Sequence, residues 1–178
     1  DKPILAPSGA PIWTAVTIDT ARMRLYIGTG ENYTRPATGT SDAIIAFSLD
    51  HGNIEWVHQT MTEDAWNGAC VTLTRRDNCP EDNGPDADFG APPVLVRTDG
   101  GDILLAGQKS GIVFAMDPDK DGELLWQQQV GRGGTMGGIH WGMATDGKTL
   151  YVPINDRGVY GIHQDVPKSP GLHAVNIE

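Results

Sequence analysis

The chain has 178 residues, of which 39% are hydrophobic and 20% charged, and its formal net charge is −10 at pH 7. This length and composition are those of a globular protein with a sizeable core. The acidic balance argues against a nucleic-acid partner and against an anionic membrane surface, because both attract basic proteins. No window contains the roughly 18 consecutive apolar residues that a membrane span requires.

Short strands are expected along the whole chain. Glycine and proline are abundant, with 23 and 12 residues, which suits strands joined by tight turns. Segments rich in β-branched or aromatic residues and bounded by Gly, Pro, Asp or Asn lie, in chain order, at 24–30, 91–97, 102–110 and 150–156. Because no window shows a sustained 3.6-residue apolar period, the sequence predicts an all-β fold.

A repeat organises the chain. AIIAFSLDHGNIEW ends at Trp56 and GIVFAMDPDKDGELLW ends at Trp126, and a third copy begins at LHAVNIE, where Ala174 takes the place of Ala46 and Ala115. Each copy passes from an apolar strand through an Ala and an acidic turn, and the first two continue to a Gly and a strand closed by Trp. The repeat predicts a β-propeller of four-stranded blades, in which Trp56 and Trp126 belong to the core. We expect the chain to be a piece of a longer repeat protein.

Residues 61–90 contain many polar and turn residues and predict a long loop, a kind of segment that is usually functional or disordered. Cys70 and Cys79 lie nine positions apart in it. A disulfide between them would close a loop and indicate an oxidising compartment, and two reduced thiols are the alternative. The chain has no CxxC pair, HExxH or GxSxG motif, which removes the common zinc and serine hydrolase interpretations.

The Ala-x-[Asp/Ser/Asn]…Gly…Trp repeat resembles the tryptophan-docking motif of quinoprotein alcohol dehydrogenases. The stretches GTGENY, ATGTSDAIIAF, DAWNGAC, DFGAPPVL, GQKSG and GGIHWGMA resemble most closely the polyvinyl-alcohol-dehydrogenase-like branch of that family. The resemblance runs through essentially all of residues 1–178, which we expect to form one partial propeller domain with a loop insert at about 61–90. It implies about three of eight blades, the cofactor pyrroloquinoline quinone and a calcium ion.

The resemblance implies cofactor contacts at three positions. IWTAVTID carries Trp13 six residues before Asp19, the spacing at which the family places the Trp beneath the quinone, although a core Trp is the alternative. GQKSG supplies Lys109, which matches an Arg or Lys near the quinone carbonyl oxygens, with a surface lysine as the alternative. GGIHW places His140 where the family has an Asn, and the neighbouring Trp141 is expected to be structural.

The metal ligands and the general base are also implied by resemblance. In GTGENY, Glu31 stands where the family has a metal-binding Asn, and Asn32 follows it, so either could offer an oxygen to calcium. TEDAW matches the start of an Asp-x-Trp-Asp stretch, which makes Asp64 the expected general base and a further metal ligand. Asp86 and Asp88 are its rivals, because they lie where the similarity resumes after the insert.

The function implied is that of a bacterial periplasmic or secreted enzyme that oxidises secondary alcohols or polyols, with hydride passing to C5 of the quinone and Asp64 accepting the hydroxyl proton. Electrons would leave to a cytochrome c, or to haem c in a domain outside this chain. The alternative is a non-catalytic propeller that acts as a scaffold or assembly factor, because fold does not determine function. The chain alone is expected to be inactive and able to self-associate through open blade edges.

Overall fold

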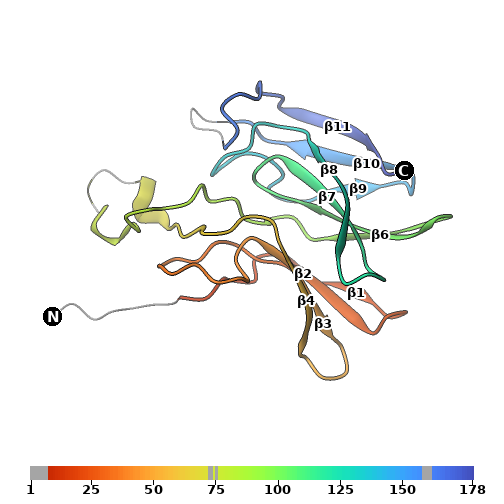
Figure 1. Cartoon of the computed structure of the whole chain (residues 1–178). Helices are drawn as coiled ribbons and strands as arrows, with labels where there is room; N and C mark the ends of the chain where they lie inside the picture. The colour runs from red at the N-terminus through yellow and green to blue at the C-terminus, as the bar shows by residue number, and fades with distance from the viewer. Residues whose placement is uncertain (1–7, 72–73, 75, 158–161) are drawn as a thin grey trace.

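The computed structural model describes residues 8–71, 74, 76–157 and 162–178. They form three antiparallel sheets, shown in Figure 1. The first sheet contains β1 (Thr17–Asp19), β2 (Arg24–Gly28), β3 (Ala43–Ser48) and β4 (Ile54–Gln59). The second contains β5 (Val94–Thr98), β6 (Gly101–Gly107), β7 (Ile112–Asp117) and β8 (Glu123–Gln129). The third contains β9 (Ala144–Thr145), β10 (Thr149–Ile154) and β11 (Gly171–Asn176).

Each sheet is a meander in which consecutive strands are hydrogen-bonded neighbours. Such sheets, two with four strands and one with three among the described residues, confirm the predicted all-β blades. The only helices in the described part of the chain are two short 3₁₀ turns, η1 (Gly68–Val71) and η2 (Arg76–Asn78), both inside the expected loop insert. Neither is long or apolar enough to cross a bilayer.

The sequence repeat corresponds to a repeat in strand register. Ala46 pairs with Tyr26, Ala115 with Leu105 and Ala174 with Tyr151. On the other side, Ala46 faces Trp56 and Ala115 faces Trp126, and the register shifts immediately after each Ala. The three alanines therefore occupy the same position in successive sheets, as the sequence predicts.

The core lies between successive sheets. Trp56 is buried in a cluster that joins the first sheet to the second through Tyr26, Leu104 and Phe114. Its ring lies against Gly122 in the turn between β7 and β8. Trp126 is partly buried and packs against the cluster shared by the second and third sheets. The two tryptophans therefore take part in contacts between sheets, as expected from the repeat.

Alternate connections emerge at one end of the sheets, because antiparallel strands return the chain to the same end at every second connection. These connections are residues 29–42, 60–93, 108–111 and 130–143, and Figure 1 shows them on the side opposite the tight hairpin turns. Residues 60–93 form the longest connection between strands of the described part of the chain, where the sequence predicts a long loop at 61–90. A disulfide joins Cys70 to Cys79 within it.

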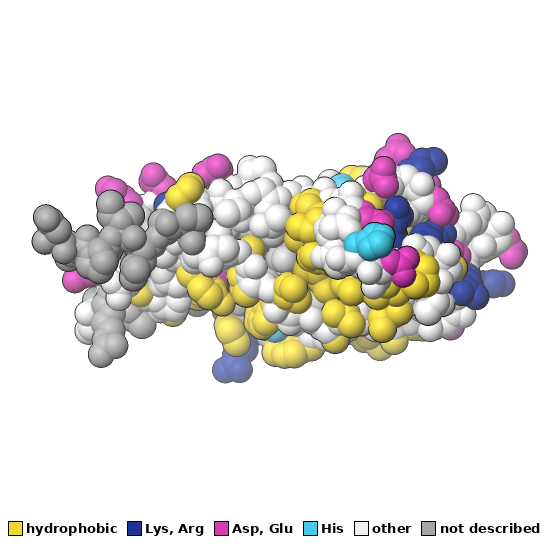
Figure 2. Space-filling model, turned by 90° about the horizontal axis from the view of Figure 1, so that it is seen from below, with side chains coloured by type: hydrophobic (Ala, Val, Ile, Leu, Met, Phe, Trp, Pro, Cys, Tyr) yellow, Lys and Arg dark blue, Asp and Glu magenta, His cyan; other side chains and the backbone are white. Residues whose placement is uncertain are grey.

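Apolar side chains remain exposed on the first sheet. Figure 2, which views the molecule from below, shows them gathered over the face that this sheet forms. Ile12, Val16 and Ile18, which lie in β1 or just before it, are each more than half exposed. An apolar face of this kind is typical of a surface that packs against another element or another chain.

Candidate functional site

A cavity of about 330 Å³ lies among the connections at this end of the sheets. Its lining includes Trp13, Glu31, Asp86, Asp88, Lys109 and His140, which come from five separate segments of the chain. Ligand cavities in proteins typically measure roughly 300–1,000 Å³ and combine apolar walls with a few polar groups. The size and the lining of this cavity fit that description.

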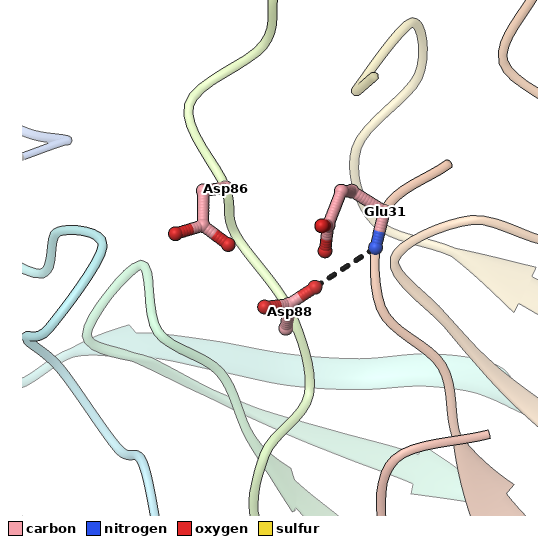
Figure 3. Close-up of side chains that lie close together, drawn as sticks. All are labelled: Glu31, Asp86 and Asp88. Atoms are coloured by element: carbon pink, nitrogen blue, oxygen red, sulfur yellow. Dashed lines mark hydrogen bonds between the residues drawn. The ribbon is translucent and has the colours of Figure 1, made fainter. Parts of the chain in front are cut away.

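Three carboxyl groups converge in the cavity, as Figure 3 shows. Glu31 belongs to the connection between β2 and β3, whereas Asp86 and Asp88 belong to the connection between β4 and β5. One oxygen from each of the three lies within 4.8 Å of the others, and all three residues are buried. The backbone N–H of Glu31 donates to Asp88 Oδ1 at 2.8 Å. A Cβ at Gly30 would lie 2.4 Å from the same oxygen, so the close approach of the two segments requires glycine there.

Lys109 supplies the cation of the cluster. Its Nζ donates to Asp86 Oδ1 at 2.6 Å and to Asp88 Oδ2 at 2.9 Å. The residue is only 2% exposed, so it is not an ordinary surface lysine. Three carboxylates against one ammonium leave a formal charge of −2 when all four groups are ionised. Buried charge of this kind is stable only when it is paired or bound to a metal.

Burial and mutual repulsion separate the acidities of the three carboxyl groups. Burial raises the pKa of Glu31 to about 10, and the neighbouring Asp88 adds to the shift. Burial also raises the pKa of Asp86 to about 8, although the charge of Lys109 opposes it. For Asp88 burial again favours the neutral form, but contacts with Glu31 and the charge of Lys109 outweigh it and lower the pKa. Asp88 is therefore the carboxylate most firmly held in its ionised form.

The donor set fits a hard cation such as calcium, which prefers carboxylate and carbonyl oxygens. Besides the three converging carboxyl groups, Asp86 Oδ2 is buried and has no hydrogen-bond partner among the described residues. A divalent ion would also balance the formal charge of −2 that the cluster carries when all four groups are ionised. Glu31, Asp86 and Asp88 are thus the residues that could hold a metal ion.

Asn32 does not join this cluster. Its Oδ1 accepts hydrogen bonds from the backbone N–H and the hydroxyl of Thr38, at 2.9 and 3.1 Å. Its backbone forms a bridge with Ala65. Of the two adjacent candidates in GTGENY, the structure brings Glu31 to the carboxyl groups and uses Asn32 to hold the loop.

Asp64 is fully buried, and it is absent from the lining of the cavity. Its Oδ2 accepts the backbone N–H of Ala87 at 3.0 Å, and its Oδ1 accepts that of Asp86 at 3.4 Å. Asp64 therefore holds the segment that carries Asp86 and Asp88. Its contacts are those of a residue that positions this segment.

An aromatic wall faces the charged cluster. Trp13 is 46% exposed, and Lys109 Nζ lies 5.2 Å from the centroid of its ring. The ring of His140 meets the Trp13 ring edge to face, with 5.3 Å between the ring centroids, and the Trp141 ring lies 4.4 Å from that of His140. Burial and the charge of Lys109 lower the pKa of His140. The exposed ring of Trp13 offers a flat surface on which a planar ligand can stack.

Sequence reasoning did not single out Tyr33, Thr135 or Met136, which also line the cavity. Tyr33 directly follows GTGEN, so its neighbourhood in the sequence offered a weak signal. Thr135 and Met136 carry no pattern that could have identified them. Trp66, two positions after Asp64 in the chain, also lines the cavity.

Comparison with solved structures supports the propeller architecture. The quinohemoprotein alcohol dehydrogenase from Comamonas testosteroni superimposes with a TM-score of 0.60 at 17% sequence identity, over 83% of this chain and 26% of that one. At this level of identity the match shows the fold alone.

The chain belongs to the PQQ_2 family, whose model is described as outer membrane protein assembly factor BamB and matches residues 4–138. Two curated relatives are named polyvinylalcohol dehydrogenase. One, from Pseudomonas sp., is 41% identical over 177 residues, and the other, from Sphingopyxis sp. (strain 113P3), is 36% identical over 173 residues. The matches cover 99% and 96% of this chain but only 26% of each relative. The chain thus spans about a quarter of the length of these relatives.

Proposed function

We propose that this chain forms part of a pyrroloquinoline-quinone-dependent dehydrogenase that oxidises secondary alcohols or polyols such as polyvinyl alcohol. The observation that carries the proposal is that three buried carboxyl groups, Lys109 and the exposed ring of Trp13 all line one cavity. The similarity to two polyvinylalcohol dehydrogenases supports it. A scaffold or assembly factor, the function that the description of the family model names, has no need of this charged cavity.

Each group in the cavity then has a role. Trp13 and His140 would hold a planar cofactor, Lys109 would place a positive charge at its edge, and Glu31 and Asp88 would offer oxygens to a metal ion such as calcium. Pyrroloquinoline quinone, when bound, would supply the oxidising quinone, with the metal ion as a Lewis acid beside it.

Asp86 is the carboxylate best placed to accept the hydroxyl proton of the alcohol. Both oxygens of Asp88 are engaged, one by the Glu31 N–H and the other by Lys109. Both oxygens of Asp64 accept backbone N–H groups. Asp86 lines the cavity and keeps Oδ2 without a partner among the described residues. A general base needs such a free oxygen within reach of the substrate. In this assignment Asp64 positions the segment that bears the base.

The setting we propose is the bacterial periplasm or the medium outside the cell. The Cys70–Cys79 disulfide supports an oxidising compartment. Electrons would pass to a cytochrome c, or to haem c in a domain outside this chain. Further blades would cover the exposed apolar face of the first sheet in the complete protein, and self-association could cover it in the isolated chain.

The test is dye-linked oxidation of secondary alcohols and polyols by the complete protein, with calcium, in the presence and absence of pyrroloquinoline quinone. Loss of a general base lowers turnover by roughly 10²–10⁴-fold, so Asp86→Asn is expected to do so while still binding the quinone. Asp64→Asn is expected to retain more turnover than Asp86→Asn. The reverse order would return the role of base to Asp64, and the absence of quinone-dependent turnover would favour the scaffold.

A further inference from the structure

A second cavity, of about 650 Å³, lies beside the cavity that holds the carboxyl groups. Tyr33, which is 48% exposed, lines both cavities, so a single aromatic side chain stands between them. We propose that the second cavity is a subsite for the chain of a neutral polyol, one of whose hydroxyl groups reaches Asp86. This inference rests on the proposed function and specifies how that site would take a long substrate.

The size of the second cavity exceeds what a small alcohol needs. Its volume is about twice that of the first cavity, 650 against 330 Å³, and lies well within the range of roughly 300–1,000 Å³ for ligand sites. A short alcohol bound at Asp86 would leave this space unused. A polymer that reacts at one hydroxyl must continue beyond it, and the second cavity offers room for that continuation.

Arg35 joins two walls of the second cavity. Its Nη1 donates to Glu63 Oε2 at 2.5 Å, and its Nε donates to the carbonyl of Asp82 at 3.1 Å. The guanidinium therefore connects the start of the loop insert to the segment that follows η2. Because Arg35 is already engaged, it has little remaining capacity to bind an anionic ligand.

Asn67 joins the remaining walls. Its amide nitrogen donates to the carbonyl of Tyr33 at 3.0 Å and to that of Asn78 at 2.9 Å. The Cys70–Cys79 disulfide is a second, covalent link between the same two parts of the loop that Asn67 joins to Asn78. The cavity is thus formed before a ligand arrives, and binding to a preformed site loses less conformational entropy.

The chemistry of the lining selects the ligand. Glu63, Glu81 and Asp82 offer carboxylates against the one guanidinium of Arg35, which leaves a formal charge of −2 and disfavours anionic chains. Carboxylates accept hydrogen bonds from hydroxyl groups, whereas the side chains of Tyr33, Pro80 and Cys79 offer apolar surface. A carbon chain with hydroxyl groups at regular intervals matches both features.

Replacing an exposed lining residue by a large one tests the subsite without disturbing the core. Glu81→Trp places an indole at the second cavity, and Asp50→Trp makes the same change in the exposed turn at the opposite end of β3. Turnover is measured in the complete protein, loaded with quinone and calcium, on polyvinyl alcohol and on pentane-2,4-diol, which contains the same 1,3-diol unit. In Glu81→Trp we expect kcat/KM to fall about tenfold or more for the polymer, the equivalent of about 1.4 kcal/mol, and to stay unchanged for the diol. Asp50→Trp should change neither.

An equal effect of Glu81→Trp on both substrates, or no effect on either, would overturn the subsite. Affinity electrophoresis in gels that contain polyvinyl alcohol provides a readout without turnover, in which the polymer should retard the wild-type protein more than Glu81→Trp. Retardation without quinone-dependent turnover would uphold the subsite and reject the proposed function. The absence of retardation, or its reversal by a polyamine but not by an added polyol, would overturn the subsite.

Discussion

The indole ring of Trp56 lies so close to Gly122 that a Cβ at position 122 would be 2.6 Å from Cζ3 of the ring. Trp56 belongs to β4 of the first sheet, and Gly122 belongs to the turn that precedes β8 of the second. The glycine also has a φ of 74°, in the left-handed region. Glycine at this position thus meets two requirements: it adopts the left-handed turn conformation, and its lack of a side chain leaves room for the indole ring of Trp56.

Gly122→Ala is therefore expected to destabilise the protein more than Gly52→Ala. Both glycines have positive φ angles, 74° and 69°, but a Cβ at Gly52 would meet nothing within 4 Å. Because the backbone strain is similar in the two variants, the difference between their free energies of unfolding reports the clash with Trp56. Overpacking of this kind typically costs about 1–3 kcal/mol. Urea denaturation of the two variants measures the difference, and equal losses would show that the ring moves away without cost.

Lys109→Met should destabilise the protein strongly, because it leaves Asp86 and Asp88 buried without their cation. Removing one partner of a buried ion pair typically costs about 3–5 kcal/mol. The matched control is Lys148→Met, since Lys148 is exposed and precedes β10. Chemical denaturation without added metal provides the measurement. Similar stability of the two variants would indicate that the carboxyl groups simply become protonated.

Glu31→Gln should weaken calcium binding, because it removes one of the three converging carboxylates. We expect a loss of at least about tenfold, since even residues that only orient metal ligands change affinity by roughly 10–100-fold. Titration calorimetry compares this variant with Glu123→Gln, an exposed position at the start of β8. Unchanged affinity in Glu31→Gln would place the metal ion elsewhere.

Acid should remove the contribution of Asp19 to stability. Burial opposes the ionisation of Asp19, but hydrogen bonds from Arg22 and Tyr26 outweigh it and lower the pKa below 3.8. A lowered pKa means that the ionised group stabilises the fold above 3.8 and that this contribution is lost as the pH falls through the folded-state pKa. The difference in unfolding free energy between wild type and Asp19→Asn should therefore be large near about pH 6 and shrink under acid conditions. A difference that does not depend on pH would show that Asp19 acts through its shape alone.

Much of the fold could be predicted because its signals are local. Alternating apolar residues, turn residues and the Ala-to-Trp spacing lie within about 15 positions, a range over which side-chain pattern reports directly on a strand pair. The register of Ala46, Ala115 and Ala174 follows from that repetition. The disulfide was one of two open alternatives, because spacing alone does not determine whether two thiols are oxidised.

The site was less predictable from the sequence. Trp13, Glu31, Lys109 and His140 were assigned by resemblance, and the structure brings all four to one cavity. The choice among the carboxyl groups depends on contacts across the loop insert, where Asp64 binds the backbone of a segment that lies 22 positions later in the chain. No local pattern reports which of two such carboxylates faces a cavity and which faces the main chain.

The carboxyl groups and their cation come from connections that belong to two different sheets. Glu31 lies in a connection of the first sheet and Lys109 in a connection of the second. Asp86 and Asp88 lie in the connection that joins the first sheet to the second. A partly folded chain with only one sheet in place would therefore have no complete set of ligands. A metal ion would therefore bind only after the two sheets have docked. Because it would bind the native state alone, it would stabilise the docked arrangement against unfolding.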